Sequence, residues 1–165
     1  MRIRVPALIL LLFTVSACAN MGRFNQVLNP EGQSKDDLQK MPYETTLKYG
    51  FRVSAARDVA AQEDLLIQNV DEQFTEFSAC FNITDRGKKV REYLIAVVNG
   101  TFECKYHNGR CNGEYDEDYR LLIVTYKAFN RRGILPLLKH EWAHIYGILR
   151  NDHWNLKDVQ ICTKY

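Results

Sequence analysis

A histidine–glutamate motif near the end of the chain constrains the sequence more than any other feature. Residues 140–144 read H-E-W-A-H and lie in an apolar segment. On a helix, residues four apart project from the same side, so the imidazoles of His140 and His144 can reach one point. Glu141 sits one step around the helix, beside that point. This spacing is typical of two zinc ligands with an adjacent general base.

A catalytic zinc ion needs a third protein ligand, and the sequence offers three candidates after the motif. No glutamate follows His144, but Asp152, His153 and Asp158 do. We expect His153 to be the ligand, because imidazole binds zinc more commonly and a turn at residues 151–152 can bring it back to the ion. Asp152 remains the alternative ligand, and either aspartate could orient a ligand imidazole instead.

The N-terminus has the form of an export signal. Two arginines precede the apolar run at residues 5–15, which is too short to span a bilayer comfortably. Residues 15–18, V-S-A-C, resemble the cleavage site of bacterial lipoproteins. That resemblance implies removal of residues 1–17 and a diacylglyceryl group on Cys18, followed by a flexible tether over residues 18–44. The outer membrane is favoured in a Gram-negative cell, and an ordinary signal peptide is the alternative.

The charge balance gives no reason to expect a nucleic-acid partner. The chain has 22 Lys and Arg against 20 Asp and Glu, and two of the arginines lie in the predicted signal. The processed chain would therefore carry no net formal charge. No basic helix or basic stripe with interleaved aromatic residues is present in the sequence, so we predict no nucleic-acid binding.

The cysteines predict two disulfides. With Cys18 lipidated, four cysteines remain in an exported protein, and four cysteines allow three connectivities. Cys104 and Cys111 flank an Asn-Gly turn signal, so a bridge across a hairpin is expected there. Cys80 and Cys162 then pair by elimination. The alternative, cysteine zinc ligands, is disfavoured because no C-x-x-C spacing occurs.

Apolar periodicity predicts one α+β domain over residues 45–165. Strands are expected at residues 45–55, 93–98, 102–106 and 121–126, an amphipathic helix at 58–78, the motif helix at 134–150 and a short last helix at 153–162. Residues 112–118 are acidic and predict a solvated loop, since their spacing does not fit a calcium-binding loop.

These residues and this order of elements resemble the zincin metallopeptidases. In that superfamily a small mixed sheet packs on a long helix and an H-E-x-x-H helix. The resemblance implies that His140 and His144 bind zinc and that Glu141 is the general base for a zinc-bound water. The extended metzincin pattern has a third histidine where this chain has Arg150. The resemblance is therefore closer to zincins whose third histidine, here His153, follows a longer turn.

The sequence thus predicts a membrane-anchored zinc peptidase that acts on protein or peptide substrates. A second hypothesis is a zincin-like binding or structural lipoprotein of the cell envelope without turnover, which the small size of the chain favours. A third is that the histidines are ordinary core residues and bind no metal.

Overall fold

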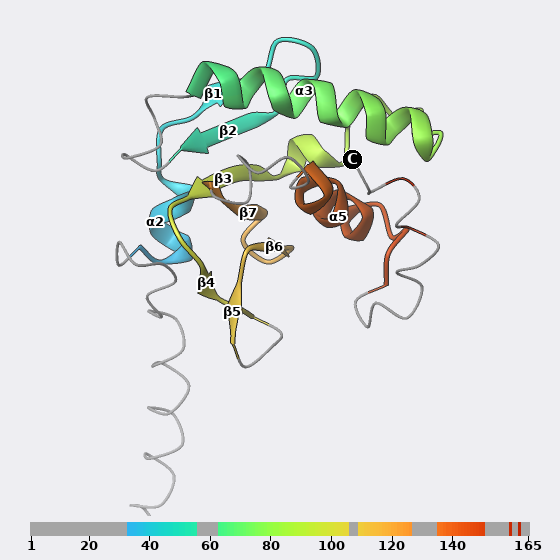
Figure 1. Cartoon of the computed structure of the whole chain (residues 1–165). Coiled ribbons are helices and arrows are strands. Elements are labelled where there is room, and N and C mark those ends of the chain that lie inside the picture. Colours follow the sequence, from blue (N-terminus) through green and yellow to red (C-terminus); the bar gives the residue numbers. More distant parts are fainter. Residues whose placement is uncertain are drawn as a thin grey trace, which may run out of the picture.

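The computed structural model describes residues 33–55, 63–105, 109–126 and 135–150, together with Val159 and Cys162. Within these residues, five strands form a mixed sheet (Figure 1). In order across the sheet, the strands are β1 (Glu44–Thr45), β2 (Arg52–Ala55), β3 (Leu94–Val98), β7 (Leu121–Thr125) and β6 (Gly113–Asp116). The two outer pairs are antiparallel and the two inner pairs parallel. The predicted α+β class with a small mixed sheet is confirmed.

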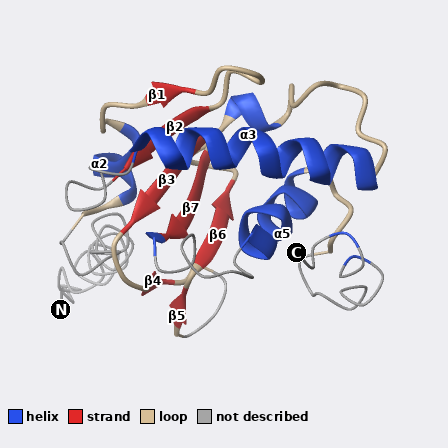
Figure 2. Ribbon diagram, turned by 45° about the horizontal axis from the view of Figure 1, so that its top comes forward, coloured by secondary structure: helices blue, strands red, loops and turns tan. Residues whose placement is uncertain are grey.

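Both faces of the sheet are covered, as expected from central strands β3 and β7 that are apolar at every position except Thr125. Every residue of these two strands is buried, and alternate residues face opposite sides. One side packs against helices α3 (Glu63–Cys80) and α5 (Leu135–Ile145) (Figure 2). The other side packs against helix α2 (Lys35–Gln39) and Phe102. Helix α5, which carries the motif, therefore rests on a core that the sheet supports.

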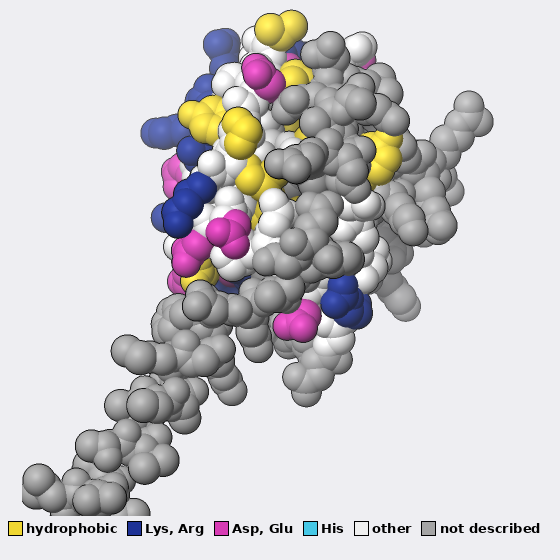
Figure 3. Space-filling view, turned by 90° about the vertical axis from the view of Figure 1, so that its left-hand side faces the viewer, with side chains coloured by type: hydrophobic (Ala, Val, Ile, Leu, Met, Phe, Trp, Pro, Cys, Tyr) yellow, Lys and Arg dark blue, Asp and Glu magenta, His cyan; other side chains and the backbone are white. Residues whose placement is uncertain are grey.

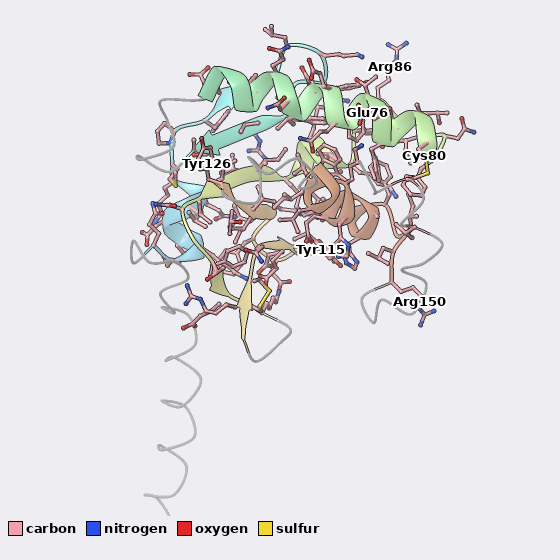
Figure 4. All side chains as sticks on the ribbon, in the orientation of Figure 1. Glu76, Cys80, Arg86, Tyr115, Tyr126 and Arg150 are labelled. Carbon is pink, nitrogen blue, oxygen red and sulfur yellow. A yellow bond between two sulfur atoms is a disulfide. The ribbon has the colours of Figure 1, made fainter. Side chains whose placement is uncertain are left out.

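An aromatic cluster and an ion pair between a buried lysine and an exposed glutamate hold α5 against α3. The ring centroid of Trp142 lies 5.2 Å from that of Phe74 and 5.7 Å from that of Phe77. Immediately before the motif, Lys139 is buried, and its Nζ lies 2.6 Å from Oε2 of Glu76, which Figure 4 labels on α3. These contacts fix the rotation of α5 about its axis. They consequently decide the direction in which the motif histidines point.

Two disulfides join the cysteines that the sequence paired. Cys80, at the end of α3, is bonded to Cys162, 82 residues further along the chain. Cys104 is bonded to Cys111 across the hairpin of β4 (Phe102–Glu103) and β5 (Arg110–Cys111). A bridge that closes a loop as long as the first restricts the unfolded chain and contributes about 4 kcal/mol to stability in the chain-entropy model.

The folded domain begins earlier than the sequence predicted. Residues 35–39 were assigned to the tether, but they form α2. The helix starts with a capping box, in which Ser34 and Asp37 each accept a backbone N–H from the other. Leu38 is 0% exposed and packs under the sheet. A single apolar residue produces no periodicity, so the sequence pattern did not reveal this helix.

The strand predicted over residues 45–55 is in fact two antiparallel strands, β1 and β2. Between them the buried hydroxyl of Thr46 accepts the N–H of Phe51, and Gly50 adopts a φ of +70°. A residue in this left-handed region reverses the chain within a stretch whose β-branched and aromatic residues suggested one strand. The strand predicted at residues 102–106 is likewise shorter, since β4 ends at Glu103.

Residues 112–118, predicted to be a solvated acidic loop, contain strand β6. Glu114 and Asp116 are only 6% and 0% exposed. Lys35 Nζ lies 2.7 Å from Glu114 Oε1 and also bonds Asp116, and Lys105 Nζ lies 3.0 Å from Asp116 Oδ1. Burial would raise the pKa of Asp116, but the hydrogen bonds from the two lysines outweigh it and lower that pKa. Both carboxylates can be buried because lysines from other parts of the chain pair with them.

The described surface carries charged and apolar side chains side by side. Figure 3 shows the face that carries α2 and β1, where acidic and basic side chains are interspersed. Two large hydrophobic side chains, Tyr43 and Leu47, are exposed in this region at 49% and 98%. Within the described ranges, no helix has both the length and the apolar character needed to cross a bilayer.

Replacing Lys35 should destabilise the fold by leaving buried carboxylates short of a partner. We expect Lys35→Met to lower the free energy of unfolding by about 3 kcal/mol at neutral pH, the lower end for breaking a buried pair, because Lys105 still contacts Asp116. Urea unfolding followed by circular dichroism measures this change.

The matched control is Lys40→Met, which removes an exposed lysine just after the same helix and should change stability by less than about 0.5 kcal/mol. Since the pKa of Asp116 is lowered in the folded state, its contribution is present at neutral pH and is lost as the pH falls through that lowered pKa. The gap between wild type and Lys35→Met should therefore narrow below about pH 4. If Lys35→Met and Lys40→Met lowered the free energy of unfolding equally, this would contradict the role given to the ion pairs of Lys35 with Glu114 and Asp116.

Candidate metal centre

Helix α5 presents the two motif histidines side by side at the border of the core. Trp142 faces the aromatic cluster, whereas His140 and His144 lie on the other side of the helix and are half-buried. Their rings meet at 78° with centroids 4.9 Å apart. The two Nε2 atoms are 3.3 Å apart. Both nitrogens therefore point toward one position, as the four-residue spacing predicted.

The separation of the two Nε2 atoms fits tetrahedral metal coordination. With metal–nitrogen bonds of about 2.0–2.1 Å and a tetrahedral angle, two ligand nitrogens stand about 3.3–3.4 Å apart. The measured distance between His140 and His144 is 3.3 Å. A hydrogen bond from His140 to His144 would suit the same distance in the metal-free protein. The donor set and its spacing thus fit zinc with little rearrangement of either ring.

A turn directly after α5 orients the ring of His144. The helix ends at Ile145, not near residue 150 as predicted, because Gly147 adopts a φ of +68° and reverses the chain. The N–H of Ile148 then donates to the carbonyl of Ala143 at 2.8 Å. The reversed chain places the carbonyl oxygen of Leu149 3.1 Å from Nδ1 of His144. Only a protonated Nδ1 can donate there, which leaves Nε2 of this imidazole as the metal-binding atom.

The side chain of Glu141 extends from α5 to strand β6. Its side chain is only 5% exposed, and its carboxylate accepts the backbone N–H of Tyr115. Burial raises the pKa of Glu141 to about 8, with a further rise from the negative charge of Glu114. A cation held by the neighbouring histidines would lower the pKa of Glu141, because an opposite charge favours the ionised carboxylate.

Two residues of β6 shape the site, and sequence reasoning missed both. A Cβ on Gly113 would lie 2.6 Å from Cδ1 of Leu137 and 2.8 Å from Oε1 of Glu141, so only glycine allows the strand to come this close to α5. Two residues along, the ring of Tyr115 stacks on that of His144, with centroids 5.4 Å apart and planes at 18° (Figure 4). The sequence signal that could have revealed this strand is the alternation of Gly113 and Tyr115 with the acidic residues Glu114 and Asp116.

The candidates for the third zinc ligand, His153, Asp152 and Asp158, lie outside the described residues. The predicted lipidation site, Cys18, also lies outside them. Among the residues that are described, no three histidine, cysteine or acidic side chains come together as a metal-binding group. The structure brings His140 and His144 together, Glu141 follows His140 on the same helix, and the third ligand remains a prediction.

No protein-family model matches the chain, and no curated protein or solved structure is significantly similar to it. The chemistry of the site is consequently inferred from its own residues and their geometry.

Filling the space at Gly113 should disturb the site. We expect Gly113→Ala to lower the free energy of unfolding by about 1–3 kcal/mol, because the added methyl group would overlap Leu137 and Glu141 and push β6 from α5. Thermal and urea unfolding measure the loss.

The control for this change is Gly109→Ala in the β4–β5 hairpin, where a Cβ would meet nothing within 4 Å. This variant should stay within about 0.5 kcal/mol of wild type. A Gly113→Ala protein as stable as the Gly109→Ala protein would show that β6 does not approach α5 as described.

Proposed function

We propose that this protein is a zinc-dependent peptidase anchored to a membrane of the cell envelope. The observation that carries the proposal is the pair of Nε2 atoms of His140 and His144, 3.3 Å apart, together with the buried side chain of Glu141, the residue after His140 on the same helix. A hydrogen bond between the two rings would explain their spacing but not the buried carboxylate of the residue between them in the sequence. In a zincin-type site this arrangement supplies two metal ligands and a base.

Zinc would be held by His140, His144 and a third residue in the segment after Arg150, for which His153 is our candidate. When bound, zinc polarises a carbonyl group and makes water more acidic. The hydrogen bond from His144 Nδ1 to the Leu149 carbonyl keeps one ligand ring in the orientation and tautomer that this role requires.

Glu141 is the proton carrier in this proposal. Its carboxylate would take a proton from the attacking water and later give it to the leaving amine. The N–H of Tyr115 holds the carboxylate in place, and burial keeps bulk water away from it. Burial raises the pKa of Glu141 to about 8 in the metal-free protein, and a bound cation would lower that pKa and favour the ionised carboxylate that accepts the proton.

The backbone of β6 favours an extended peptide as the substrate. Thr125 donates its N–H to the carbonyl of Asn112, so the alternation of an antiparallel ladder turns the backbone polar groups of Gly113 away from β7. The N–H of Tyr115 also points away from β7 and is donated to the Glu141 carboxylate. Strand β6 is also the last strand of the described sheet. A peptide that adds to this edge at Gly113 would run past the two histidines and Glu141.

The membrane anchor in this proposal is a lipid on Cys18, which the V-S-A-C segment at residues 15–18 supports. The wild-type protein expressed in a bacterium should pellet with membranes and leave them only in detergent. Cys18→Ser should move it to the soluble exported fraction or block its processing. A wild-type protein that fractionates without membranes would contradict lipidation.

The enzymatic part is tested by zinc content and peptide hydrolysis. The purified wild-type protein should bind about one zinc ion and cleave members of an extended peptide library. Glu141→Gln should keep the zinc and lower the turnover number by a factor of about 100 to 10,000, since only the base is lost. His140→Ala should lose both zinc and activity.

The control is Glu72→Gln, which changes an exposed carboxylate on α3 in the same way and should leave hydrolysis unchanged. If wild type binds zinc but cleaves no peptide, the activity is absent and the binding or structural lipoprotein becomes the better account. If it binds no zinc after preparation without chelators, the metal site itself is wrong.

A further inference from the structure

We propose that Tyr115 is a positioning residue for the metal site, acting by clamping the imidazole of His144 from strand β6. The inference rests on the proposed zinc site, because its effect is exerted on a zinc ligand. Tyr115 is assigned no contact with the metal or with substrate.

Two contacts restrain the His144 ring in complementary ways. The hydrogen bond from Nδ1 to the Leu149 carbonyl, at 3.1 Å, fixes one edge of the ring but leaves the ring able to rock about that bond. The phenol ring of Tyr115 lies almost parallel to the imidazole, at 18° and a centroid distance of 5.4 Å, and so restricts that motion. Together the two contacts direct Nε2 toward the Nε2 of His140.

The buried ion pairs on the opposite face of β6 hold Tyr115 in this position. Successive side chains of a strand point to opposite faces, so Tyr115 faces α5 when its neighbours Glu114 and Asp116 face away. Lys35 bonds both carboxylates, and Lys105 bonds Asp116. Rotating β6 to withdraw Tyr115 from His144 would break these buried contacts. The clamp is therefore set by the fold rather than by metal binding.

The clamp organises the ligand before zinc arrives. A ring that is already aimed at the metal position loses less freedom on binding, which raises affinity. Removing the aromatic ring of Tyr115 should weaken zinc binding about tenfold, within the range seen when groups that orient metal ligands are removed. A phenylalanine keeps the stacking surface and should preserve the affinity.

The experiment compares zinc affinity in Tyr115→Phe, Tyr115→Leu and Tyr119→Ala, measured by competition with a chromogenic chelator. Tyr115→Leu keeps apolar cover over His144 but removes the ring plane, so the fold can be retained, as circular dichroism and thermal unfolding will show. Tyr119→Ala is the matched control, because it removes a nearby tyrosine that packs on the other side of the sheet. The visible absorption spectrum of the cobalt-substituted proteins reports ligand geometry independently of activity.

We expect wild-type affinity in Tyr115→Phe and Tyr119→Ala, and about tenfold weaker binding with an altered cobalt spectrum in Tyr115→Leu. Wild-type affinity and spectrum in Tyr115→Leu would overturn the positioning role and leave the zinc site intact. A loss in Tyr119→Ala equal to that in Tyr115→Leu would also overturn it, since general destabilisation would then be the cause. Failure of the wild-type protein to bind zinc would overturn the proposed function together with this inference.

Discussion

The close contact between strand β6 and helix α5 is the constraint on which the candidate site depends. Gly113 has no side chain, and a Cβ there would lie within 3 Å of both Leu137 and Glu141. This approach lets the N–H of Tyr115 reach the Glu141 carboxylate and lets its ring lie on His144. One strand thus contacts the proposed base through its backbone and a proposed metal ligand through a side chain.

Holding β6 in this place requires burying two carboxylates on its other face. Burial of Glu114 and Asp116 would be costly without partners, and the structure supplies Lys35 from α2 and Lys105 from the β4–β5 hairpin. The Cys104–Cys111 disulfide closes that hairpin, and Lys105 directly follows Cys104. The disulfide therefore helps to hold Lys105 near β6. The site therefore depends on segments that are distant from it in the sequence.

The features that the sequence predicted well are those set by local periodicity. The apolar runs that became β3 and β7 needed only burial on both faces, and the spacing of His140 and His144 needed only a helix. Strand β6 was missed because its two buried residues, Glu114 and Asp116, are acidic, and the lysines that neutralise them lie at positions 35 and 105. The early end of α5 was missed because it depends on the left-handed conformation of Gly147.

The central claim is that the Nε2 atoms of His140 and His144 bind one zinc ion, and X-ray absorption at the zinc edge tests it most directly. In the zinc-loaded protein we predict a first shell of nitrogen and oxygen atoms at about 2.0–2.1 Å with the outer-shell scattering of at least two imidazoles, and no bound zinc in His140→Ala. A shell with sulfur at about 2.3 Å, or one without imidazole scattering, would contradict the account.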